Sequence, residues 1–249
     1  MADPGVSSHQ QQTLLVLPAF NEEGSVGQVL REIAEALPGI RCLVVNDGST
    51  DNTRRNAVAA GATVLDLPFN LGVGGAMRAG FKFAAANGYR NVVQIDADGQ
   101  HDPRNVLALL ARLDSADIVI GARFAGAGDY GARGPRLWAM FVLARVISRI
   151  SRVHLTDVTS GFKANGPRAV ALFAEHFPAE YLGDTLEALV IAAGAKLRIT
   201  QVPVAMRPRQ AGNPSQHPFK AAVYLGRACI ALVFALMRPR VKVSSEDTQ

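Results

Sequence analysis

The chain has 249 residues, of which 49% are hydrophobic and 19% charged, and this composition is typical of one globular domain with a sizeable core, not of a disordered chain. Its net charge of +5 is unevenly spread, because residues 1–122 carry 9 basic and 13 acidic side chains and residues 123–249 carry 17 and 8. The acidic half favours a cation site. The basic half favours phosphates or anionic lipid, although a basic face is also an ordinary solubility feature.

The first half alternates short apolar strands with helices. Strands are predicted over residues 14–17, 42–45, 64–67, 92–95 and 118–120. Helices are predicted over residues 26–37, 50–60, 75–86 and 103–110, the last with Asp102 as N-cap and Pro103 as its first residue. Alternation at this spacing predicts an α/β fold with a doubly wound, mostly parallel sheet of the nucleotide-binding type.

The second half is less regular, with a helix predicted over residues 137–150, a strand over 199–204 and a helix over 219–237. The longest uncharged run of the last helix is too short for a bilayer of about 30 Å. An interfacial helix and a core helix both fit it. The N-terminus lacks the apolar core of a secretory signal, and Cys42 and Cys229 are interpreted as buried thiols of a reducing compartment.

Two carboxylates follow the apolar strand of residues 92–95. Asp96 and Asp98 are separated by one residue, so on an extended chain both side chains point the same way. Neighbouring carboxylates repel unless a cation lies between them, and oxygen ligands favour Mg²⁺ or Mn²⁺. Gln100 adds a further oxygen in the same alternation. Asp-x-Asp also occurs in solvated turns, but its place at the carboxyl end of a buried strand favours the metal interpretation.

Polar turns also follow the first two strands. In the turn of residues 46–53, Asp47 is the candidate carboxylate for a ribose or a base edge, whereas Thr50 and Asp51 are interpreted as caps of the next helix. The glycine-rich segment 70–80 lacks the full Gly-x-Gly-x-x-Gly spacing and follows the third strand, so it is not interpreted as a dinucleotide loop.

Taken together, these segments resemble the family 2 glycosyltransferases with the GT-A fold, in the branch similar to dolichyl-phosphate mannose synthase. The matching segments are residues 18–22, 45–51, 70–72, 96–101, 121–124, 157–163 and 202–204. They predict a single GT-A domain over residues 13–215. A basic amphipathic helix over 216–243 and polar tails over 1–12 and 244–249 would complete the chain.

The resemblance implies a role for each matching position. The donor nucleotide would be bound by Pro18, Phe20, Glu22, Val45, Asp47, Asp96 and Ala97. The metal would be bound by Asp96, Asp98 and Gln100. The catalytic residues would be Asp98, Arg123 near the donor or lipid phosphate, and Arg209 in a phosphate-binding loop that reaches Ser215. The acceptor region would contain Thr159, Ser160, Lys163, Asp184, Glu187 and Arg207.

Two positions depart from the family pattern. Asn46 stands where the family often has a second aspartate, which leaves Asp47 to make the contact. Gln216 stands where a lysine is common in the basic loop of residues 207–220. Both departures fall in segments that the resemblance assigns to phosphate or nucleotide binding.

The expected reaction is inverting transfer of a hexose, mannose or glucose, from GDP-mannose or UDP-glucose to a polyprenyl phosphate, with Mg²⁺ or Mn²⁺ as cofactor. A phosphate is already anionic near neutral pH, so it can attack the sugar without a strong base. The resemblance implies a cytoplasmic enzyme, peripheral at an anionic membrane surface that helix 137–150 would face, and we expect no nucleic-acid partner. A soluble phosphorylated or sugar acceptor is the alternative. A third hypothesis is a non-enzymatic subunit that binds nucleotide sugars. Such a subunit would be indicated by the loss of an aspartate from the Asp-x-Asp motif.

Overall fold

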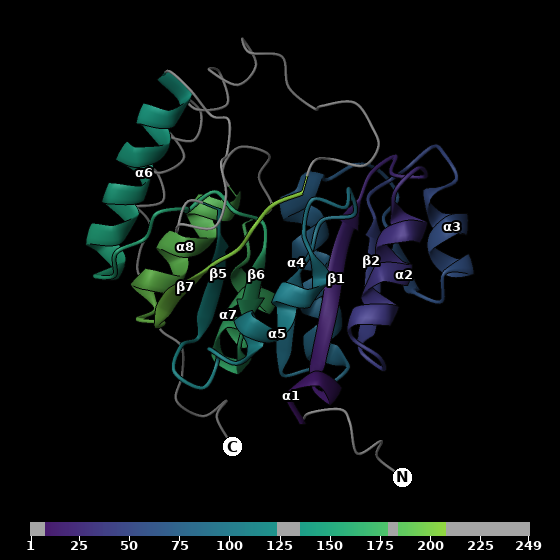
Figure 1. Ribbon diagram of the computed structural model, residues 1–249, viewed down its shortest axis with the longest axis horizontal. Helices are drawn as coiled ribbons and strands as arrows, with labels where there is room; N and C mark the ends of the chain where they lie inside the picture. Colours follow the sequence, from purple (N-terminus) through teal and green to yellow (C-terminus); the bar gives the residue numbers. More distant parts are fainter. Residues whose placement is uncertain (1–7, 124–134, 179–183, 208–249) are drawn as a thin grey trace.

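The computed structural model describes residues 8–123, 135–178 and 184–207 (Figure 1). These residues form a seven-stranded sheet in the order β3-β2-β1-β4-β6-β5-β7. The strands are β1 (Thr13–Ala19), β2 (Arg41–Asn46), β3 (Thr63–Asp66), β4 (Asn91–Gln94), β5 (Ile118–Ala122), β6 (Lys163–Asn165) and β7 (Ile199–Pro203).

The sheet is mostly parallel, as the alternation of strands and helices predicts. The strand pairs β1–β2, β1–β4, β2–β3 and β5–β7 are parallel, and β6 is antiparallel to both β4 and β5. The sequence did not predict β6. Its three residues are too few to show an alternating pattern, and pairing with β4 and β5 alone makes them a strand.

Helices cover both faces of the sheet (Figure 1). They are α1 (Ser8–Gln11), α2 (Val26–Ala36), α3 (Thr53–Ala59), α4 (Gly72–Ala86), α5 (Val106–Leu110), α6 (Pro135–Ser151), α7 (Pro167–His176) and α8 (Asp184–Gly194). The short α1 lies in a segment that we expected to be a polar tail. Helices α7 and α8 were not predicted, and α4 begins three residues before its predicted start.

The predicted start of the helix over residues 103–110 is confirmed. The side chain of Asp102 accepts a hydrogen bond from the backbone N–H of Arg104, and Pro103 opens a 3₁₀ turn over Pro103–Asn105. Helix α5 follows directly after this turn. The cap therefore fixes the chain direction immediately after the two carboxylates of the candidate metal loop.

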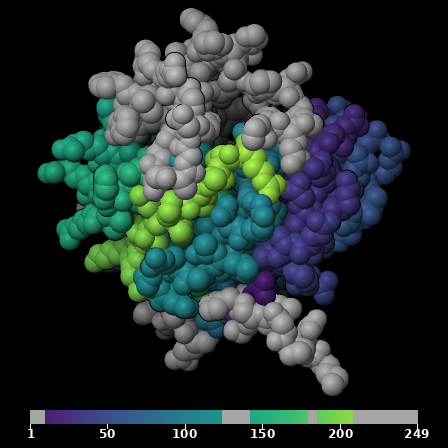
Figure 2. Space-filling view, viewed as in Figure 1, coloured from purple at the N-terminus to yellow at the C-terminus, as the bar shows by residue number. Residues whose placement is uncertain are grey.

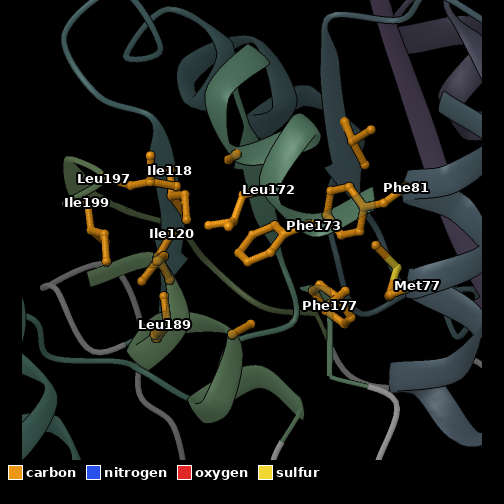
Figure 3. Close-up of a cluster of buried hydrophobic side chains, with 14 of the residues drawn as sticks. Met77, Phe81, Ile118, Ile120, Leu172, Phe173, Phe177, Leu189, Leu197 and Ile199 are labelled. Atoms are coloured by element: carbon orange, nitrogen blue, oxygen red, sulfur yellow. The ribbon is translucent and has the colours of Figure 1, made fainter. Parts of the chain in front are cut away.

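Alternation along the strands divides the core into two layers. Leu15 and Leu17 of β1 face the layer covered by α2, α3 and α5, whereas Leu14 and Val16 face the layer under α4, α6, α7 and α8. Figure 3 shows the second layer, in which Phe81, Phe173 and Phe177 pack with ring centroids 5.1 to 5.2 Å apart. These two layers hold the sheet rigid beneath its carboxyl edge.

Some expectations fall on residues beyond the described part of the chain. These are the helix 219–237, Cys229, Arg209 and Gln216. Cys42 is a free thiol that packs partly buried against the core, and burial raises the pKa of its thiol to about 12. Among the described helices, none combines the length and the apolar character that a bilayer crossing requires.

Candidate active site

Polar residues from four strands meet at one edge of the sheet. Strands β1, β2, β4 and β5 run in one direction, so the loops that follow them leave from the same carboxyl edge. These loops begin with Phe20, Asp47, Ile95 and Arg123. The loop after β4 carries Asp96 and Asp98. Open α/β sheets bind their ligands at this edge, which makes it the candidate active site.

The loop after β4 folds back on itself around Asp96. The backbone N–H of Asp96 donates to Nδ1 of His101 at 3.0 Å, and the side-chain amide of Gln94 donates to Oδ1 of Asp96 at 3.4 Å. In the same loop, Oδ1 of Asp98 accepts the backbone N–H of Gln100 at 3.0 Å. The carboxylate of Asp96 is therefore held by Gln94 at the end of β4, and that of Asp98 by the backbone of its own loop. The sequence pattern revealed neither contact.

The donor atoms of this loop fit a hard divalent cation. Two carboxylates and an amide oxygen lie within five residues, and oxygen is the ligand that Mg²⁺ and Mn²⁺ prefer. Across residues 8–123, 135–178 and 184–207, no three His, Cys, Asp or Glu side chains group closely enough to bind a metal by themselves. Such a loop matches an ion that keeps several waters and also binds substrate phosphates.

The chain before β6 closes against Asp96. A Cβ atom on Gly161 would lie 3.2 Å from Oδ1 and 3.3 Å from Oδ2 of Asp96, and 3.0 Å from the amide nitrogen of Gln94. These distances are tighter than ordinary van der Waals contacts, so any side chain here would press on the carboxylate. The absence of a side chain at Gly161 therefore leaves room for Asp96.

Asp47 is buried and joins the loop after β2 to helix α4. Its two carboxylate oxygens accept the backbone N–H groups of Leu71 and Gly72 at 2.7 and 2.8 Å. Burial raises the pKa of Asp47, and these two hydrogen bonds offset only part of that effect. Gly48, at a φ of 70°, allows the close approach, because a Cβ there would lie 2.8 Å from the backbone of Asn70. The predicted contact with ribose or base stays a prediction.

The loops after β1 and β2 bind each other. The N–H of Asn21 donates to the hydroxyl of Ser49, and the N–H of Thr50 donates to the side chain of Asn21. Asp51 accepts the N–H of Thr53, the first residue of α3, but the N-cap position is Asn52, so the caps predicted at Thr50 and Asp51 are misplaced. These hydrogen bonds hold the two loops together on one side of the candidate site.

The predicted nucleotide-binding residues differ in exposure. Phe20 is 46% exposed, and Pro18 and Glu22 are half-buried beside it. Val45 and Ala97 lie in the hydrophobic core, with 0% and 2% exposed. Of these residues, Phe20 therefore has the most surface open to a base, and the roles of all five stay predictions.

Arg123 forms a buried ion pair at the end of β5. Its guanidinium donates to both carboxylate oxygens of Asp157 at 2.6 and 2.8 Å and to the hydroxyl of Thr159 at 2.7 Å. Burial alone raises the pKa of Asp157, but the hydrogen bonds and charge of Arg123 outweigh it and hold that pKa below its usual value. Asp157 was not predicted, although it opens the matching segment 157–163.

The residues assigned to the acceptor region do not form one exposed surface. Ser160, Lys163 and Glu187 are 2%, 6% and 7% exposed. The guanidinium of Arg207 binds Oε2 of Glu32 at 2.6 Å and Oδ2 of Asp102 at 2.9 Å. Asp184 begins α8. Their contact with an acceptor stays a prediction, and the observed contacts of Arg207 are those of a bridge between elements.

The mostly parallel sheet has the fold of the GT-A glycosyltransferases, and the loop of Asp96 and Asp98 lies at its carboxyl edge. The family model for glycosyl transferase family 2 matches residues 14–169, which is more than half of the sequence. The chain belongs to this family and is a glycosyltransferase. The predicted resemblance is confirmed.

Two curated relatives match the predicted branch. Polyprenol monophosphomannose synthase of Mycolicibacterium smegmatis is 32% identical over 173 residues, which cover 65% of this chain and 64% of the relative. Undecaprenyl-phosphate mannosyltransferase of Micrococcus luteus is 31% identical over 214 residues, 81% of this chain and 86% of the relative.

A solved structure supports the fold. Glucosyl-3-phosphoglycerate synthase of Mycobacterium tuberculosis, in complex with Mn²⁺, UDP and glucosyl-3-phosphoglycerate, superposes with a TM-score of 0.68. The match covers 96% of this chain and 87% of the other, at 21% identity. At this identity the likeness shows the GT-A fold and no more.

Proposed function

We propose that this glycosyltransferase transfers a hexose from a nucleoside diphosphate sugar to a polyprenyl phosphate, with inversion at the anomeric carbon. The observation that carries the proposal is the presence of a carboxylate pair and a fixed guanidinium at one edge of the sheet. Asp96 and Asp98 suit a cation beside the donor diphosphate, and Arg123 suits an anionic phosphate. Both relatives described above are named for polyprenyl phosphate chemistry.

The residues of the site would act by binding and orientation. Asp96, Asp98 and Gln100 would hold Mg²⁺ or Mn²⁺, which when bound neutralises the leaving diphosphate. A phosphate oxygen of the acceptor forms the new bond to the anomeric carbon. As it does so, the bond to the donor diphosphate breaks and its electron pair leaves with the nucleoside diphosphate. Asp157 fixes the orientation of Arg123, so little ordering remains when an anion binds.

The position of α6 supports a peripheral membrane location. Arg145 and Arg149 on α6 and Arg152 directly after it are all exposed, while Leu143 and Ile147 of the same helix are buried. Each basic side chain near an anionic surface contributes about 1 kcal/mol of attraction. We propose that this face meets the cytoplasmic side of a membrane, where the lipid acceptor is found. The family resemblance gives Arg209, which lies outside the described residues, a contact with substrate phosphates.

The deciding experiment is a transfer assay with two acceptors. Radiolabelled GDP-mannose and UDP-glucose would each be incubated with the protein, Mn²⁺ and either undecaprenyl phosphate or 3-phosphoglycerate. The proposal expects label in the organic phase with the lipid acceptor and none after chelation. Label on 3-phosphoglycerate instead would establish the soluble-acceptor alternative, which matches the acceptor named in the solved structures. Donor binding without transfer to any acceptor would favour a binding subunit.

A further inference from the structure

His101 is a buried side chain in the metal loop that the proposed reaction does not use. It is 3% exposed and follows Gln100 directly. Its ring stacks on Phe162, with centroids 4.8 Å apart and an interplanar angle of 16°. Phe162 belongs to the segment that enters β6, so the stack joins the metal loop to the chain that also carries Gly161.

The imidazole of His101 contacts both the backbone and the side chain of Asp96. Nδ1 accepts the N–H of Asp96 at 3.0 Å, which requires the ring proton to be on Nε2. Nε2 lies 3.7 Å from Oδ2 of the same residue. One ring therefore restricts the peptide unit and the carboxylate of Asp96 together.

The backbone around His101 is held by the chain that follows β7. His101 forms an isolated antiparallel bridge with Met206, and the carbonyl of Gln100 accepts the N–H of Arg207 at 3.0 Å. In Figure 2 the yellow-green chain after β7 runs beside the teal α5 region toward the purple α2. His101 thus contacts two separate segments, Phe162 through its ring and Met206 through its backbone.

We infer that His101 is a positioning residue, which fixes Asp96 so that both carboxylates of the loop face one cation before that cation binds. Two adjacent carboxylates repel each other in the absence of metal, so an unsupported loop would separate them. The contacts of His101 oppose this separation. Groups that orient metal ligands typically change metal affinity by about 10- to 100-fold. This inference rests on the proposed metal-dependent function.

Three variants separate the hydrogen bond of His101 from its stacking. His101→Phe keeps a ring against Phe162 but removes the acceptor for the N–H of Asp96. His101→Asn keeps an acceptor oxygen near the position of Nδ1 but removes the stack. Phe162→Leu removes the stack while leaving the imidazole in place. If positioning is the role, His101→Phe should be the most damaging of the three.

The measurement is titration of the metal-free protein with MnCl₂ alone, following free Mn²⁺ by electron paramagnetic resonance. His101→Phe should weaken Mn²⁺ binding by about 10-fold or more, and His101→Asn should restore most of the affinity. In the transfer assay, the Mn²⁺ concentration for half-maximal rate should rise while the rate at saturating Mn²⁺ changes little. Wild-type Mn²⁺ affinity in His101→Phe, or equal losses in all three variants, would overturn the inference.

Two further measurements keep the test decisive. Hydrogen exchange of the metal-free protein reports on the N–H of Asp96, which should exchange faster in His101→Phe and at the wild-type rate in His101→Asn. This readout applies to any variant that still folds. Asp98→Asn serves as the control for the metal site: if it binds Mn²⁺ like the wild type, the proposed function fails. If Asp98→Asn loses binding and His101→Phe does not, only the inference on His101 fails.

Discussion

Replacing Asp157 by Asn tests how strongly the ion pair with Arg123 stabilises the fold. The side chains of Asp157 and Arg123 are 0% and 13% exposed, so the substitution removes the charge of Asp157 from a largely buried guanidinium. Removing one partner of such a pair costs about 3–5 kcal/mol. In a chain of this length, that corresponds to a fall in Tm of roughly 6–20 °C.

Thermal unfolding at neutral pH would be measured for Asp157→Asn, Arg123→Met and the double variant Arg123→Met/Asp157→Asn. The double variant should lose less stability than the two single variants combined, because it leaves no buried charge. It should also be inactive while folded, since Arg123 is the proposed phosphate contact. A Tm of Asp157→Asn equal to that of the wild type, or strict additivity in the double variant, would refute the reasoning.

The same ion pair predicts a pH dependence. The pKa of Asp157 is lowered in the folded protein, so its charge stabilises the fold above its usual pKa of about 3.9, and this contribution is lost as the pH falls through the folded value. The stability difference between wild type and Asp157→Asn should therefore shrink in acid. A difference that stays constant with pH would show that the charge is not the cause.

Replacing Asp98 by Asn removes one carboxylate from the proposed metal pair, so the rate of sugar transfer should fall by orders of magnitude. The Tm should stay close to that of the wild type. Full activity in excess chelator would contradict the metal assignment. Replacing Arg145, Arg149 and Arg152 by Gln should weaken binding to anionic vesicles by roughly 3 kcal/mol at modest salt, as measured by co-sedimentation. Unchanged binding would show that these three charges only face solvent. The pKa of Asp102 is lowered to about 2, chiefly by hydrogen bonds from Arg104. The charge of Asp102 therefore stabilises the fold above about pH 4, and this contribution is lost as the pH falls toward 2. Urea unfolding should show a cost of Asp102→Asn at about pH 6 that disappears near pH 2, and an equal cost at both would argue against this role.

Local pattern was enough to predict most of the first half of the fold. The apolar runs of β1, β2 and β4 are buried, and the periodic apolar residues of α2 lie on its buried face. In the second half, the pattern predicted α6 and β7 to within two residues at each end but missed β6, α7 and α8. Strand β6 contains Lys163 and Asn165, which no propensity assigns to a strand, and the nearly uniform apolar sequence of α8 shows no helical period.

The candidate site likewise has features that the local sequence predicts and features that only long-range contacts create. The spacing of Asp96 and Asp98 after a buried strand is a local signal, and it was sufficient to propose a metal loop. The partner of Arg123 is Asp157, 34 residues further along the chain, and no spacing rule connects the two. The use of both oxygens of Asp47 by helix α4 was equally invisible, because that contact spans 24 and 25 residues.

The sequence by itself determined the class of this protein: alternating apolar strands and helices require a doubly wound sheet, and polar residues after several parallel strands must meet at one edge. Both follow from periodicity and from strand direction, which neighbouring residues encode. Only the tertiary structure decided which side chains hold the site in place. His101 stacks on Phe162, and Arg207 bridges Glu32 and Asp102. These contacts join residues far apart in the chain, so they exist only after packing has brought the elements together.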